Sequence, residues 1–274
     1  MKNLSLKTVF TFLCAALFTL QAQAQFSGLL DKAKQKANDK LNQAMEKKAN
    51  GSQPNGTANG HKIKINSTFD FKTCDSAIYV DDFSTNSAGK MPASWKTNGS
   101  GEIVKISEFS GKWLQLQSYA SYKLTKLIKY PSKFTIEFDI VAVADKIADL
   151  NPLGFGFAGD NSVRGYLQDA YNDGAINNIS LEYYNNRGII EASSDTQYHH
   201  TDEDLDLQGF ANQLMHVSIA VDGENEQVYL NKTKISDTKM FKPNRLKYFY
   251  ISAPLQSSNG AKVLFGNFKL MGCK

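Results

Sequence analysis

The stretch Phe134-Thr135-Ile136-Glu137-Phe138-Asp139-Ile140 decides the fold class of this chain. Its apolar and polar side chains alternate strictly, so one face of the segment is apolar and the other is polar. A period of two is typical of a half-buried strand in an antiparallel sheet. The alternation returns in Leu214–Val221, after which Asp222-Gly223 predicts a turn and Gln227–Asn231 the returning partner strand.

Short alternating segments of this kind continue to the end of the chain. A strand is expected over Val263–Leu270, with Leu264, Phe268 and Leu270 on one face. The other candidates centre on Ile78–Phe83, Glu102–Ile106, Trp113–Gln117, Leu124–Ile128, Leu153–Phe157, Ile179–Tyr184, Ile189–Glu191 and Tyr248–Ile251. Many short strands without a helical pattern between them predict an all-β, two-sheet antiparallel β-sandwich, with a barrel as the alternative.

The composition of the 274 residues agrees with a folded β-rich protein. Hydrophobic residues make up 42% and charged residues 21%, which excludes wholesale disorder and fibrous repeats. The formal net charge of +4 is too small to indicate a nucleic-acid partner. Residues 26–50 carry six Lys against three acids, so the basic character belongs to one short segment.

Residues 1–24 have the pattern of a secretory signal peptide. Two lysines precede the mostly apolar run Val9–Leu20, and Ala22-Gln23-Ala24 predicts cleavage before Gln25. A run of this length spans about 18 Å as a helix, too short for a hydrocarbon core of about 30 Å. We therefore expect an exported protein without a transmembrane segment. Its location is expected to be periplasmic or extracellular, and association with the outer membrane stays open.

The mature chain is expected to have three parts. Residues 25–50 form a Lys/Ala-rich helical arm, 51–60 a flexible linker and 61–274 the β-sandwich domain. The arm is interpreted as a solvated spacer; the alternative is a peripheral contact of residues 26–50 with an anionic membrane or a partner helix.

Two cysteines remain after removal of the leader, which contains Cys14. An even pair in an oxidising compartment predicts a disulfide between Cys74 and Cys273, and the alternative is two free thiols. Because these residues flank the first and last strands, we expect their Cα atoms within about 4.4–6.8 Å.

An ordered series of motifs carries a resemblance to a known family. The motifs are Asp81-Asp82-Phe83-Ser84, Gly89–Trp95, Gly111–Leu114 and Phe134–Asp139. The series resembles the β-sandwich region that precedes the peptidoglycan-binding domain in some exported proteins of the outer-membrane-protein-A-like family. Met215–Gly223 with Val228–Asn231 resembles a laminin-G or concanavalin A-like hairpin. The resemblance implies a concanavalin A-like jelly roll over most of 77–270; because the chain stops at Lys274, cell-wall anchoring is not carried over.

Some concanavalin-like sandwiches are glycosidases, so the acidic residues are candidate catalysts. Glu137 and Asp139 match two acids of a Glu-x-Asp-x-(x)-Glu signature, but Val141 or Ala142 stands where the third would be. A retaining mechanism needs a nucleophile and a separate acid. We expect no catalytic residues, and interpret Glu137 and Asp139 as polar side chains on the solvent face.

The sequence fits neither a metal-binding nor a phosphate-binding motif. His199–Asp206 collects two His and four acids without the spacing of a calcium loop, and is interpreted as a solvated loop. His216 is interpreted as structural, and Gly154–Gly159 lacks the Lys and Ser or Thr of a phosphate loop. No metal or cofactor is expected.

A crowded segment, Asn177–Arg187, offers the best sequence signal for ligand binding. Alternation places Tyr183 inside and Tyr184 outside, so the candidate ligand-binding residues are Tyr184, Asn185, Asn186 and Arg187. The alternative is an ordinary Asn-rich turn.

The sequence thus predicts an exported, non-catalytic binding module of the cell envelope that recognises a glycan or a protein partner. Two alternatives stay open. One is a glycoside hydrolase or lyase, and the other is a structural envelope protein docked by its basic arm.

Overall fold

The computed structural model describes residues 69–170, 174–184, 189–195, 200–204 and 207–274. The chain divides into two compact units, Met1–Lys64 and Ile65–Lys274, and all described residues belong to the second. The leader, arm and linker expected over residues 1–60 lie outside the described residues. Within the described part, no helix is both long and apolar enough to cross a membrane.

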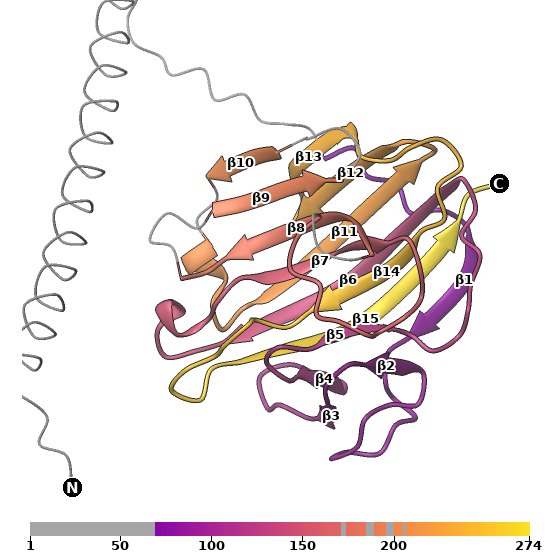
Figure 1. Cartoon of the computed structure of the whole chain (residues 1–274). Coiled ribbons are helices and arrows are strands. Elements are labelled where there is room, and N and C mark those ends of the chain that lie inside the picture. The colour runs from indigo at the N-terminus through magenta and orange to yellow at the C-terminus, as the bar shows by residue number, and fades with distance from the viewer. Residues whose placement is uncertain (1–68, 171–173, 185–188, 196–199, 205–206) are drawn as a thin grey trace, which may run out of the picture. The chain divides into compact units, whose positions relative to one another are not determined.

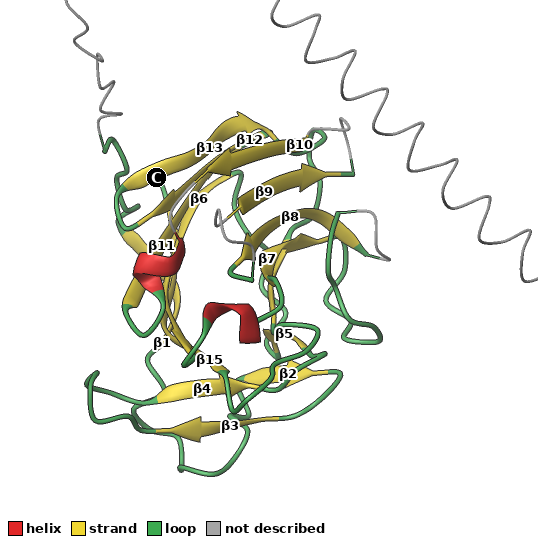
Figure 2. Cartoon of the chain, turned by 90° about the vertical axis from the view of Figure 1, so that its left-hand side faces the viewer, coloured by secondary structure: helices red, strands yellow, loops and turns green. Residues whose placement is uncertain are grey.

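The described residues form an antiparallel β-sandwich of two sheets (Figures 1 and 2). One, sheet A, has the order β13-β12-β11-β6-β15-β4-β3, with β1 also pairing with β15. Its strands are β1 (Ser76–Asp81), β3 (Gly101–Val104), β4 (Trp113–Leu116), β6 (Lys133–Val143), β11 (Leu214–Asp222), β12 (Asn225–Leu230), β13 (Thr233–Lys239) and β15 (Lys262–Gly272).

The other, sheet B, has the order β10-β9-β8-β7-β14-β5-β2. Its strands are β2 (Trp95–Thr97), β5 (Ser121–Leu124), β7 (Leu153–Ala158), β8 (Ala175–Glu182), β9 (Ile189–Ser194), β10 (His200–Asp204) and β14 (Tyr248–Ser252). Two short 3-10 helices occupy Ile147–Asp149 and Leu207–Phe210. The fold class expected from the alternating segments, a two-sheet sandwich, is confirmed.

Aromatic side chains dominate the core between the sheets. Phe138 of β6 has its ring centroid 5.3 Å from that of Phe155 on β7 and 5.5 Å from that of Phe265 on β15. The apolar face of the 134–140 segment is therefore the inner face, and Glu137 and Asp139 point outward from sheet A. Burial of such rings is the main stabilising term of a sandwich core.

Strand β15 departs from the simple alternation expected for it. The pairing with β6 shifts between Gly266 and Lys269, so Phe265, Phe268 and Leu270 enter the main core. Leu264 instead joins a separate cluster with Trp113 and Val141, and its expected place beside Phe268 was wrong. The cause is a β-bulge, which adds a residue and changes the phase of the strand.

Two further expectations about strands were wrong. Strand β5 ends at Leu124, where a strand over Leu124–Ile128 was expected. His200–Asp204, expected to be loop, is β10 at the edge of sheet B. An edge strand pairs on one side only and tolerates a polar sequence, which is why hydrophobic alternation did not reveal it. Strands β2 and β13 were not anticipated.

The predicted disulfide is confirmed. Cys74 and Cys273 are bonded, with their Cα atoms 4.6 Å apart across a sequence separation of 199 residues. They meet because β1 pairs with β15 and the Cys273 amide donates to the Lys133 carbonyl at 3.1 Å. The bond closes nearly the whole sandwich.

Candidate functional site

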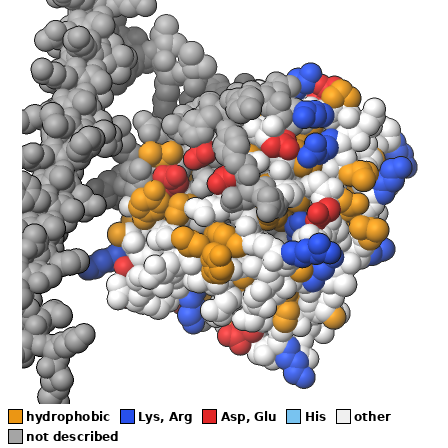
Figure 3. Space-filling view, in the orientation of Figure 1, with side chains coloured by type: hydrophobic (Ala, Val, Ile, Leu, Met, Phe, Trp, Pro, Cys, Tyr) orange, Lys and Arg blue, Asp and Glu red, His pale blue; other side chains and the backbone are white. Residues whose placement is uncertain are grey.

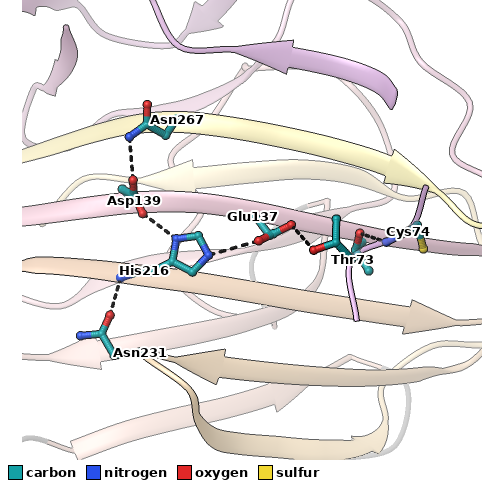
Figure 4. A network of polar contacts seen from close by, with 8 residues as sticks. Thr73, Cys74, Glu137, Asp139, His216, Asn231 and Asn267 are labelled. Atoms are coloured by element: carbon teal, nitrogen blue, oxygen red, sulfur yellow. Dashed lines mark hydrogen bonds and ion pairs between the residues drawn. The ribbon is translucent and has the colours of Figure 1, made fainter. Parts of the chain in front are cut away.

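A network of polar side chains lies on the outer face of sheet A. Pairing between β6 and β11 sets His216 opposite Asp139. His216 Nδ1 lies 2.6 Å from Asp139 Oδ1, and Nε2 lies 3.3 Å from Glu137 Oε2 (Figure 4). Each ring nitrogen therefore faces its own carboxylate.

Three segments distant in sequence hold this network in place. Asn267 of the β15 bulge donates to Asp139 Oδ2 at 2.6 Å, and the Thr73 hydroxyl donates to Glu137 Oε1 at 2.7 Å. Asn231, after β12, accepts from the His216 amide at 2.7 Å. A side-chain set with partners on both sides is pre-organised, because its rotamers are fixed before any ligand arrives.

The two carboxylates keep the imidazole charged. Hydrogen bonds to Asp139 and then to Glu137 raise the pKa of His216 to about 9, against the opposing effect of burial. The hydrogen bond from His216 lowers the pKa of Glu137 below its ordinary value. At neutral pH the network consists of an imidazolium between carboxylates, with 41% of the His216 side chain exposed and 10% of that of Asp139.

A groove of about 460 Å³ lies beside the network. Phe69 and Phe71 form its apolar side, and Glu137 and His216 contribute polar groups. Asn231 and Lys232, at the turn that follows β12, also line it. The volume falls in the range of small-molecule sites, which combine apolar walls with a few placed polar groups.

The apolar side of the groove belongs to residues 69–74, here called the strap. Asp70 accepts from the Tyr229 hydroxyl at 2.7 Å and pairs with Lys234 Nζ at 3.0 Å. The rings of Phe69 and Phe71 pack against Tyr229, with centroid distances of 5.5 and 5.6 Å. Together with the Cys74 disulfide, these contacts fix the strap on the outer face of sheet A.

Of the ligand-binding residues expected from the sequence, the structure describes Tyr184, which lies away from this groove. Tyr184 follows β8 of sheet B and is 45% exposed, whereas Tyr183 is 1% exposed and packs inside. Negative charge on Glu182, and more weakly on Glu191, raises the pKa of Tyr184. Asn185, Asn186 and Arg187 lie outside the described residues, so binding at this segment stays a prediction.

The sequence interpretation missed the network and the strap. Glu137, Asp139 and His216 were all placed correctly on polar strand faces, but their meeting depends on which strands are neighbours. The alternating Phe69-Asp70-Phe71 was a usable signal for the strap, since it puts two rings on one side. Within the described residues, no group of three His, Cys, Asp or Glu side chains is arranged to hold a metal ion.

Comparison with known proteins yields distant likenesses of structure only. No protein-family model matches the chain. No curated protein matches its sequence.

Among solved structures, a sialidase is similar at 16% identity and a TM-score of 0.48, over 73% of this chain and 19% of the sialidase. The VIP36 exoplasmic/lumenal domain in its Ca²⁺/Man2-bound form is similar at 13% identity and a TM-score of 0.48, over 70% of this chain and 86% of that one. The Emp47p carbohydrate recognition domain is similar at 12% identity and a TM-score of 0.47, over 71% and 95%. The assignment of this chain to the two-sheet β-sandwiches therefore rests on its own strand pairing.

Proposed function

We propose that the domain is a non-catalytic module that binds a glycan in the groove between the strap and His216. The observation that carries this proposal is the pairing of two phenyl rings with a fixed set of carboxylate, amide and hydroxyl groups in one groove. Sugar rings present apolar C–H faces that stack on aromatic rings, and hydroxyls that hydrogen-bond to planar polar side chains.

The protonation states of the network support binding over hydrolysis. A glycosidase needs a carboxylic acid whose pKa is raised, so that it can donate a proton to the leaving group. Here the hydrogen bond from His216 lowers the pKa of Glu137 and keeps it ionised. The hydrolase or lyase alternative thus gains no proton donor from Glu137.

The face drawn in Figure 3 does not favour a protein partner. On the face drawn in Figure 3, exposed hydrophobic side chains lie in small separate groups among polar ones. A protein interface has a contiguous, largely apolar centre, and large apolar patches mark such sites.

Export is part of the proposal. The signal-peptide pattern and the Cys74–Cys273 disulfide both support an oxidising compartment, periplasmic or extracellular. The alternative of docking through residues 26–50 remains a prediction, and deletion of that segment followed by fractionation of the envelope tests it.

The test of glycan binding uses the exported chain on an array of oligosaccharides, followed by titration calorimetry with the best ligand. Changing Phe69 and Phe71 together to Ala should lower affinity by about tenfold or more, because two stacking surfaces are lost. Leu127→Ala is the control, since that side chain is 70% exposed and lines no part of the groove. If the protein binds no oligosaccharide on the array, the proposed glycan-binding function is wrong. If the double variant binds as tightly as the wild type, the groove is not the binding site.

A second measurement addresses catalysis. On a panel of polysaccharides, neither the wild type nor the Glu137→Gln variant should show hydrolytic activity. Turnover by the wild type that this substitution abolishes would make the protein an enzyme.

A further inference from the structure

An exposed tyrosine stands in an unusual backbone conformation at the turn between β4 and β5. Tyr119 has a φ of 61°, in the left-handed region, and its side chain is 60% exposed. Bulky L residues rarely adopt this region, and Gly or Asn would be the ordinary occupant. A large aromatic ring kept there in solvent calls for an explanation other than core packing.

The turn and the ring are both firmly held. The Tyr119 amide donates to the Pro254 carbonyl at 3.0 Å, so the β4–β5 turn is tied to the segment after β14. The ring stacks on Tyr166, with centroids 4.9 Å apart and planes 30° apart. The Tyr166 hydroxyl donates to the Ala253 carbonyl at 2.7 Å. Tyr166 is thus a fixed base on which the Tyr119 ring rests.

Stacking leaves one face of the Tyr119 ring uncovered. Tyr166 covers a single face, which agrees with the high exposure of Tyr119. The Tyr119–Tyr166 pair is therefore a flat aromatic platform that is ordered before binding. A rigid ring that needs no reordering contributes affinity at a small entropic cost.

We propose that the Tyr119–Tyr166 platform is a second saccharide subsite, on which a pyranose ring of the glycan stacks its C–H face. This inference rests on the proposed glycan-binding function and adds a contact point separate from the strap groove. The exposed amides of Gln117 and Gln256 lie two residues along the chain from Tyr119 and Pro254 respectively, near enough in sequence to offer hydrogen bonds to ring hydroxyls.

The choice of substitution makes the test sharp. Tyr119→Gly removes the ring and also relieves the left-handed backbone, so this variant should unfold at the same temperature as the wild type or higher. Tyr119→Phe keeps the stacking face. Loss of binding in the Gly variant cannot then be attributed to a damaged fold.

The measurement is titration calorimetry of the exported chain with hexasaccharides of glucose, mannose, galactose, xylose and N-acetylglucosamine. For the hexasaccharide that binds, Tyr119→Gly should weaken affinity by about tenfold and Tyr119→Phe by less than about twofold. Leu127→Ala, which also removes an exposed apolar side chain, should bind like the wild type.

The outcomes separate this inference from the proposed function. If Phe69→Ala with Phe71→Ala abolishes binding while Tyr119→Gly leaves it unchanged, the platform is wrong and the function stands. If no hexasaccharide binds the wild type, both are overturned. If Tyr119→Gly spares glycan affinity and instead prevents capture of an envelope protein, the platform is a protein contact and the inference is wrong.

Discussion

His216 owes its charge to two carboxylates on one neighbouring strand, and this makes stability depend on pH. Its pKa is raised from 6.5 to about 9 in the folded state, first by Asp139 and then by Glu137. A raised histidine pKa stabilises the fold fully below the unfolded value of 6.5, and the contribution is lost as pH rises through 9.

The prediction at this residue concerns the alkaline side. The melting temperature of the wild type should fall between pH 6.5 and 9, and His216→Asn should remove most of that fall, because Asn does not titrate. Calorimetric melts in steps across this range measure it. An identical slope in the two proteins would show that His216 is not charged in the folded state.

Glu226 also has a raised pKa, but it is an acid buried in the core, so the raised pKa favours its neutral form. Both of its carboxyl oxygens accept from Asn177 Nδ2, at 2.8 and 3.0 Å, and burial raises its pKa to about 7. Ionisation of a buried acid is unfavourable, so its stabilising state is the protonated one. The contribution of Glu226 to stability is therefore fully present below pH 4.5 and is lost as pH rises through about 7.

Glu226→Gln should abolish this dependence. Above pH 7 the variant should be more stable than the wild type, by up to about 3 kcal/mol, since each pKa unit corresponds to about 1.4 kcal/mol. Urea unfolding at pH 4.5, 6 and 8 measures it. A variant that is less stable at pH 8 would indicate that the carboxylate is needed by its neighbour Lys247, whose charge interacts with it.

At the scale of elements, the bulge in β15 connects packing with the network. Gly266 has no room for a side chain, because a Cβ there would lie 2.9 Å from Trp113 Cε3. The following residue, Asn267, has a φ of 53° and donates to Asp139. The bulge thus lets Trp113 pack and aims an amide at the network.

Gly266→Ala should destabilise the domain by about 1–3 kcal/mol, as overpacking does in a tight core. Gly165→Ala is the matched control, since nothing lies within 4 Å of its Cβ position and its φ is not positive. Chemical unfolding compares the two. If both variants keep wild-type stability, the ring of Trp113 moves aside freely.

The elements also show how far a sequence can be interpreted. Strands β6, β11 and β12 were predictable because period-two alternation reports a buried face directly. The edge strand β10 and the bulge were not, because polar edges and phase changes break that period. The meeting of Asp139 with His216 depends on strand order and register over 77 residues, which alternation does not encode. The two residues were found separately and their contact was not.

At the scale of the whole molecule, the two ends of the sandwich are bound together beside the groove. The strap is anchored by the Cys74–Cys273 bond at one end and by the Asp70 contacts with Tyr229 and Lys234 at the other. The disulfide closes a loop across 199 residues of sequence. Cross-linking so distant a pair removes much of the freedom of the unfolded chain.

Replacement of both Cys74 and Cys273 by Ser should therefore lower the free energy of unfolding by about 2–5 kcal/mol. The wild type treated with a reductant should match the variant in chemical unfolding, because both lack the same cross-link. Glycan affinity should fall only modestly, since Asp70 still holds the strap, and should fall much further when Asp70→Ala is added. Because the two anchors hold one segment, their effects on binding should exceed the sum of the single changes. Additive effects, or unfolding that is indifferent to reductant, would mean that the strap is held by contacts other than these two.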